Sequence, residues 1–98
     1  MTPDEFEGTL RGDAPPPSLS RALRALWHAG RDEWDKAHAI VQEDESDPVN
    51  AWVHAHLHRV EGDLGNAGYW YRQAGKPRAQ GDLRAEWHTI VVALLEKG

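Results

Sequence analysis

The sequence predicts an all-α fold of five helices, arranged as two helical hairpins and a C-terminal helix that caps them. Three observations support this prediction. Apolar residues recur every three or four positions, which is the spacing of one helical face. Turn and capping residues separate these segments at lengths typical of helices. No segment shows the sustained alternation of apolar and polar residues that is typical of a half-buried strand.

The composition fits one compact domain. The chain has 98 residues, of which 40% are hydrophobic, and a net charge of −5 at pH 7. Its 11 Lys and Arg residues are scattered, so the basic patch that binds nucleic acid is missing. The lack of cysteine excludes disulfides and thiolate metal sites. Because the sequence shows neither a signal-peptide pattern nor an apolar run of membrane-span length, we expect a cytoplasmic protein without nucleic acid or membrane partners.

Residues 1–17 are expected to form a flexible N-terminal arm, followed by a single helical domain over residues 18–98. The Pro15-Pro16-Pro17 run favours an extended backbone and ends any regular structure before it. Phe6 and Leu10 are the only sizeable apolar side chains of the arm. An arm docked weakly on the domain and a disordered arm both stay open.

The first two helices follow the arm. Apolar residues from Leu19 to Trp27 share one helical face, and Gly30 is expected to end this helix in a left-handed conformation. Asp32 is the predicted cap of the second helix, which the acidic run 43–47 ends.

The third, fourth and fifth helices have clearer boundaries. Asp47 followed by Pro48 predicts a helix start, because proline lacks only an N–H that would be unbonded there. This third helix should end before Asp63, which caps a fourth helix that stops at Gly75. The fifth helix, 82–97, is apolar almost all the way round. Burial on two sides explains this pattern, and a homodimer contact is the second explanation.

The two predicted hairpins carry a similar pattern. Each has an acidic cap, a large apolar residue, an alanine and a further large residue four positions on. Ala37 aligns with Ala67, an offset of 30 residues, and Val41 aligns with Tyr71. A period of this size indicates stacked supersecondary units.

The second hairpin resembles the tetratricopeptide repeat. The residues that carry the resemblance are Ala55, Gly62, Asp63, Ala67, Tyr71 and Ala74. The first hairpin departs from the pattern, because Gly30 is out of register and Asp44 replaces the last alanine. The resemblance covers residues 18–77 and implies a right-handed stack of helical hairpins that binds proteins or peptides. Residues 54–75 also resemble a small family of uncharacterised bacterial proteins, which implies a complete chain and brings no known activity.

Three histidines alternate in the third predicted helix, within the stretch 52-WVHAHLHRVEGD-63. At 3.6 residues per turn, His54 and His58 share one side of the helix, whereas His56 points nearly opposite. We expect the pair to face the fourth helix in a buried cluster, where the imidazoles need hydrogen-bond partners. The predicted buried polar cluster contains His54, His58, Trp70 and Tyr71.

A divalent transition-metal site is the alternative interpretation of the pair. His54, His58 and Glu61 follow the pattern H-x3-H-x2-E, which places two imidazoles and a carboxylate on one side of a helix. His28 or His38 would supply a missing ligand if the two hairpins stack closely. Apart from such an ion, no cofactor is predicted.

The sequence favours a protein without enzymatic activity. The general base of zincin enzymes directly follows their first histidine, and this chain has Ala55 in that place. No serine lies near a histidine in a recognisable nucleophile pattern, and the glycines sit at predicted helix ends rather than in a phosphate-binding loop.

The opposite side of the third helix is predicted to line a partner-binding groove. Its residues are Trp52, His56, Arg59 and Val60. Aromatic and arginine side chains dominate interface energies, which suits recognition of a peptide or a protein helix. The alternative is that Trp52 packs inside the domain. The predicted function is therefore a small interaction module. A metal-binding protein or small metal-dependent enzyme that uses the pair is the alternative, and a homodimeric structural protein is a further one.

Overall fold

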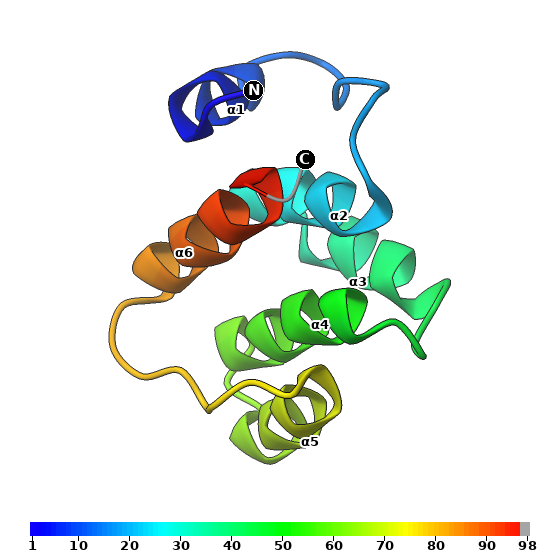
Figure 1. The fold of residues 1–98 in the computed structure, drawn as a ribbon, viewed down its shortest axis with the longest axis vertical. Helices are drawn as coiled ribbons and strands as arrows, with labels where there is room; N and C mark the ends of the chain where they lie inside the picture. The colour runs from blue at the N-terminus through cyan, green and yellow to red at the C-terminus, as the bar shows by residue number, and fades with distance from the viewer. Residues whose placement is uncertain (97–98) are drawn as a thin grey trace.

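The computed structural model describes residues 1–96, and these residues form six α-helices (Figure 1). The helices are α1 (Pro3–Thr9), α2 (Arg21–Gly30), α3 (Trp34–Gln42), α4 (Pro48–Val60), α5 (Leu64–Ala74) and α6 (Leu83–Glu96). No strand forms within the described part of the chain, so the predicted all-α class is confirmed there, with six helices where five were expected. None of these helices is both long enough and apolar enough to cross a membrane.

Consecutive helices pair into two hairpins, α2 with α3 and α4 with α5, and α6 packs on α1, α2 and α4. The contacts of α6 with three helices account for its unusually apolar surface. The fifth helix of the sequence prediction extended to residue 97, which lies outside the described residues. A homodimer contact through this helix stays a prediction.

The N-terminal residues contain helix α1, which the sequence prediction did not include. The Thr2 hydroxyl accepts a hydrogen bond from the backbone N–H of Glu5, and the Glu5 carboxylate accepts one from the backbone N–H of Thr2 at 2.7 Å. Phe6 is fully buried, and its ring centroid lies 6.0 Å from that of Trp87. In this structure the N-terminal segment is therefore docked on α6 through an apolar side chain.

Side-chain caps and a left-handed glycine set the boundaries of the second hairpin. The Asp47 carboxylate accepts from the backbone N–H of Val49 at 2.8 Å, and the Asp63 carboxylate accepts from that of Asn66 at 3.2 Å. Gly75 follows α5 with a φ of 69°. The three predicted boundaries are confirmed.

The turn between α2 and α3 differs from the prediction. Gly30 belongs to α2, and Asp32 is the residue that has a left-handed φ, of 62°. The N-cap of α3 is Glu33, so the prediction that Asp32 caps this helix is wrong. Glycine at position 30 is explained by space, because a Cβ there would lie 2.8 Å from the Trp87 ring. Gly30 therefore permits the close approach of α2 and α6.

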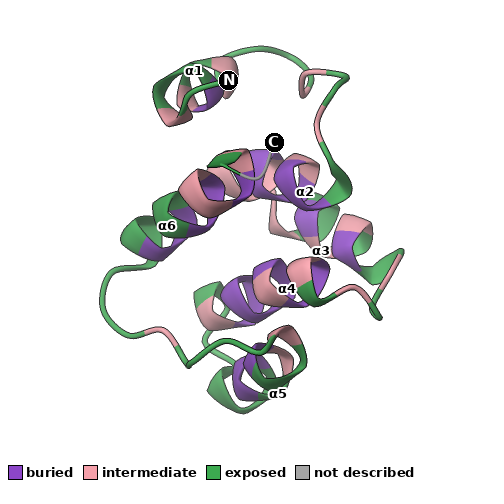
Figure 2. Cartoon of the chain, viewed as in Figure 1, coloured by how far each residue is buried: buried purple, intermediate pink, exposed green. Residues whose placement is uncertain are grey.

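Two groups of buried side chains form the interior, and α4 contributes to both. Buried residues recur along most of α4 (Figure 2). The larger group lies among α1, α2, α3, α4 and α6, where the Trp87 indole N–H donates to the Leu26 carbonyl at 2.8 Å. The smaller group consists of Ala55, Ala67 and Tyr71, between α4 and α5. Because α4 is buried on two sides, its polar residues must find partners inside the protein.

Candidate metal centre

The three histidines of α4 are all buried, but they face two different groups of side chains. The exposed fractions are 2% for His54, 3% for His56 and 6% for His58. The rings of His54 and His58 stack, with centroids 4.9 Å apart and 24° between their planes. His56 instead contacts Glu86 of α6. The helical period thus separates a pair from a single histidine.

His38 of α3 joins the pair in a cluster of three imidazoles. Its Nε2 atom lies 3.0 Å from Nε2 of His54, and its ring is nearly perpendicular to that of His58, with centroids 5.2 Å apart. One ring nitrogen from each of the three residues lies within 4.8 Å of the others. His28, the other residue considered as an additional ligand, pairs with Glu33 at 2.8 Å and stays outside this cluster.

Two tryptophans hold the imidazole rings in place. Trp34 of α3 stacks on His38 with centroids 4.5 Å apart, and Trp70 of α5 stacks on His54 with centroids 3.9 Å apart. The Trp34 indole N–H donates to the Leu57 carbonyl at 2.6 Å, which fixes the orientation of this ring. The cluster therefore connects the two hairpins, and its rings have little freedom to rotate.

Glu61, at the end of α4, defines the protonation of His58. Its Oε1 atom lies 2.6 Å from Nδ1 of His58. Because an ionised carboxylate can only accept a hydrogen bond, the neutral form of His58 carries its proton on Nδ1 and has its lone pair on Nε2. The Glu61 side chain is 38% exposed, so it reaches His58 from the edge of the cluster.

Burial keeps two of the imidazoles neutral. It lowers the pKa of His54 to about 3, because the charged ring loses hydration, and the neighbouring His38 and His58 act in the same direction. Burial and the proximity of His58 also lower the pKa of His38. Within residues 1–96, Nδ1 of His54 is buried without a hydrogen-bond partner. Neutral imidazole is the form that binds a transition metal.

The residues of the predicted buried polar cluster divide between the two sides of α4. Trp70 stacks on His54, as expected from its place on α5. The Tyr71 hydroxyl instead donates to Glu86, away from the pair. The polar neighbours of the pair are His38 and Glu61.

Glu86 of α6 gathers the polar groups on the other side of α4. Its carboxylate accepts from Nδ1 of His56 at 2.7 Å, from Nη1 of Arg59 at 3.0 Å and from the Tyr71 hydroxyl. Burial would raise the pKa of Glu86, but the hydrogen bonds from His56 and Tyr71 outweigh it and hold this pKa below its usual value. Burial and the bond to Glu86 raise the pKa of Tyr71. We call these four residues the Glu86 network.

Two of the predicted groove residues belong to the Glu86 network. His56 is buried, and the Arg59 side chain is 10% exposed and paired with Glu86. Arg59 also donates to the Gly81 carbonyl, which ties the loop before α6 to α4. In this structure both side chains face partners within the chain. Val60 is 44% exposed.

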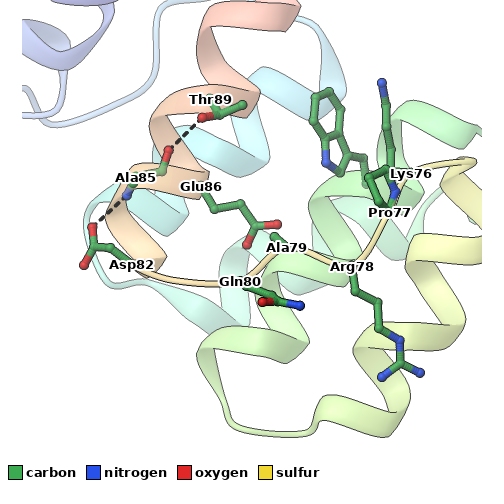
Figure 3. A pocket seen from close by; sticks show the side chains of 10 residues that line it. Lys76, Pro77, Arg78, Ala79, Gln80, Asp82, Ala85, Glu86 and Thr89 are labelled. Atoms are coloured by element: carbon green, nitrogen blue, oxygen red, sulfur yellow. Dashed lines mark hydrogen bonds between the residues drawn. The ribbon is translucent and has the colours of Figure 1, made fainter.

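Trp52 lines a pocket of about 300 Å³ between α4, α6 and residues 76–80 (Figure 3). Glu86 and Thr89 of α6 form another part of its wall. The Lys76 ammonium lies 4.3 Å from the centroid of the Trp52 ring, in a cation–π contact. Trp52 is half-buried, so part of its ring faces this pocket.

The sequence prediction missed Glu86, although a signal was present. Glu86 lies four residues before Ile90 and eight before Leu94, on the stripe of α6 that is buried in the core. A carboxylate on an apolar stripe indicates a buried ion pair, because an unpaired buried charge is too costly. The partner helix, however, is not specified by this signal.

Comparisons of the chain with protein-family models, with curated proteins and with solved structures found no match.

Proposed function

We propose that the protein binds a first-row transition metal ion through His38, His54 and His58. The observation that carries this function is the convergence of three ring nitrogens, from α3 and α4, within 4.8 Å of one another. Imidazole nitrogens bind zinc at roughly 2.0–2.1 Å, so three of them around one ion fall within this separation. A set of nitrogen donors without inner carboxylates favours Zn²⁺, Co²⁺, Ni²⁺ or Cu²⁺ over Mg²⁺ and Ca²⁺.

The charges around the cluster also favour a cation. Asp35, Glu45 and Glu61 each act on His38 in the direction that stabilises positive charge. Protons compete with metal ions for imidazole, and the low pKa of His54 removes this competition at neutral pH. These acidic side chains therefore attract a metal ion to the cluster.

Calorimetric titration of chelator-treated protein with Zn²⁺ tests this function. We expect one ion per chain. His38 is half-buried, so His38→Gln should fold normally and should weaken Zn²⁺ binding by roughly tenfold or more through the loss of a ligand. His88→Gln, at an exposed position of α6, is the matched control and should bind as the unsubstituted protein does. Equal affinity of both variants, or no binding by the unsubstituted chain, contradicts the proposal.

The pocket beside Trp52 favours a second function, the binding of a peptide or protein partner. We also propose the tetratricopeptide-like arrangement for α2 to α5, supported by the two hairpins and by the buried alanines Ala37, Ala55 and Ala67 between their helices. In that arrangement the pocket lies next to the side of α4 that the sequence predicts as a groove.

Selection of displayed peptides tests this second function. Peptides are selected on the unsubstituted protein and then depleted on Trp52→Ala, which removes the aromatic wall of the pocket. Peptides that bind the first protein and not the second support the function. A selection that yields peptides with equal affinity for both proteins, or none at all, contradicts it.

A further inference from the structure

We infer that the bound ion keeps one coordination position for an exchangeable water or small anion, because Glu61 positions His58 instead of binding the ion. This inference rests on the proposed metal site. It assigns the site to the reactive kind and not to the structural kind. Reactive zinc sites typically have three protein ligands and an exchangeable fourth ligand, whereas structural zinc sites have four protein ligands.

The Glu61 carboxylate contacts one ring nitrogen of His58 and leaves the other nitrogen for the ion. Its carboxylate lies 2.6 Å from Nδ1 of His58, so Nε2 is the nitrogen that His58 offers to an ion. The two nitrogens lie on different edges of the imidazole ring. A carboxylate that accepts the Nδ1 proton is therefore directed away from an ion at Nε2. Such a carboxylate orients a ligand histidine and raises its basicity.

The cluster offers three histidine donors to an ion. Within residues 1–96, the group that shares its donor atoms within 4.8 Å contains His38, His54 and His58 and no fourth His, Cys, Asp or Glu. Trp34 and Trp70 form aromatic walls, and an indole N–H cannot act as a metal ligand. An ion that takes four ligands must therefore complete its coordination with a molecule from solvent.

The charge and the exposure of the cluster indicate which molecule from solvent would complete the coordination. Imidazole ligands carry no negative charge to offset that of a divalent ion, so the open position favours water, hydroxide or a small anion. His38 is half-buried, whereas His54 is 2% exposed, so solvent reaches the cluster on the side of His38.

Titration of the Co²⁺-loaded protein with azide tests the open position. We expect a saturable change in the visible absorption of Co²⁺, because azide replaces water in the coordination sphere. An unchanged spectrum of stoichiometrically loaded protein overturns the inference and leaves the metal-binding function in place. Failure to bind Co²⁺, with Zn²⁺ also unbound in the calorimetric titration, overturns both.

Two substitutions of Glu61 test its positioning role. Glu61→Ala should weaken Co²⁺ binding by roughly 10- to 100-fold. Glu61→Gln should restore most of this affinity, because the amide oxygen still accepts the His58 Nδ1 proton. Both variants should respond to azide. If glutamine restores nothing and the azide response changes, Glu61 is a ligand and the inference is wrong.

Asp63→Asn is the matched control. Asparagine still caps α5, so this variant removes a carboxylate near His58 without loss of the cap. We expect unchanged Co²⁺ affinity. A loss as large as that of Glu61→Ala would place the ion among His58, Glu61 and Asp63 and would overturn the inference.

Discussion

The two sides of α4 surround buried histidines with different chemistry. On one side, His54 lies among neutral aromatic rings, and its Nδ1 atom has no hydrogen-bond partner in residues 1–96. On the other side, His56 belongs to the Glu86 network, in which both carboxylate oxygens accept hydrogen bonds. Within the described residues, histidine therefore occurs, two positions apart, in a cluster with an unpaired ring nitrogen and in a network in which both carboxylate oxygens are hydrogen-bonded.

This difference separates a binding role from a structural role. A buried network in which each polar group has a partner holds the elements that contribute to it together, here α4, α5 and α6. The three-histidine cluster instead brings three ring nitrogens within 4.8 Å of one another, which gives it capacity for a metal ion. We therefore expect substitutions in the Glu86 network to change folding, and substitutions in the three-histidine cluster to change metal binding.

The largest effect is expected for Glu86→Ala. This substitution leaves the Arg59 guanidinium and His56 without their carboxylate, and breaking a buried ion pair in this way costs about 3–5 kcal/mol. Urea unfolding measures the change in the free energy of unfolding. His88→Ala, on the exposed face of the same helix, should change it by about 0.5 kcal/mol or less. Similar values for both variants would show that the Glu86 network does not stabilise the fold.

Zn²⁺ should stabilise the protein through the other side of α4. A free Zn²⁺ concentration of 100 times the dissociation constant should add about 2.7 kcal/mol to the free energy of unfolding. His54→Leu should reduce this increment to about 1.4 kcal/mol or less, because the loss of a ligand weakens binding by roughly tenfold or more. An undiminished increment in the His54→Leu variant would place the ion elsewhere.

The same substitution on the two sides should have unequal effects in metal-free protein. His56→Leu deprives the buried Glu86 of a donor and should cost about 1–3 kcal/mol. His54→Leu removes a ring whose Nδ1 has no partner within residues 1–96 and whose Nε2 contacts only the half-buried His38 there, so it should cost less, about 1 kcal/mol or below. Thermal unfolding of both variants in the presence of a chelator measures the two costs. The comparison fails if His54→Leu is the more damaging substitution.

Acid should weaken the Glu86 network by a smaller amount. The pKa of Glu86 in the folded protein lies below the ordinary value of 4.5, so the unfolded chain takes up this proton first as the pH falls. The stability contributed by this carboxylate is present above pH 4.5 and is lost as the pH falls through the folded pKa. Glu86→Gln should therefore lose less stability than the unsubstituted protein over this interval in urea unfolding. Parallel pH profiles of the two proteins would contradict this.

Helix boundaries were predictable where the interaction that sets them is local. Asp47, Asp63 and Gly75 act on backbone groups within a few residues, so their patterns can be read directly from the sequence. Helix α2 ends at Gly30 as predicted, but glycine is needed there because of Trp87, 57 positions away in the chain (87 − 30), and not for a left-handed conformation. Helix α1 does carry a local start signal in Thr2 and Glu5, but the packing that buries Phe6 of this short helix comes from α6, and no local pattern indicates it.

The candidate site was predictable to the extent that one helix determines it. The helical period alone places His54 and His58 together and His56 apart. The contribution of His38 depends on how closely the hairpins pack, and the capture of His56 and Arg59 by Glu86 depends on the path of α6. Contacts between helices that are far apart in the sequence leave no periodic signal.

The docking of α1 on α6 has a consequence for synthesis on the ribosome. Phe6 belongs to α1, and Trp87, which its ring faces, belongs to α6, which is translated after α1 to α5. The two hairpins can pair while α6 is still being made, and the Trp27 indole N–H of α2 can already bond Thr9 of α1, but the Phe6 ring lacks its Trp87 neighbour until α6 has left the exit tunnel. Complete burial of Phe6 therefore requires α6, so this side chain reports when α6 has folded onto α1.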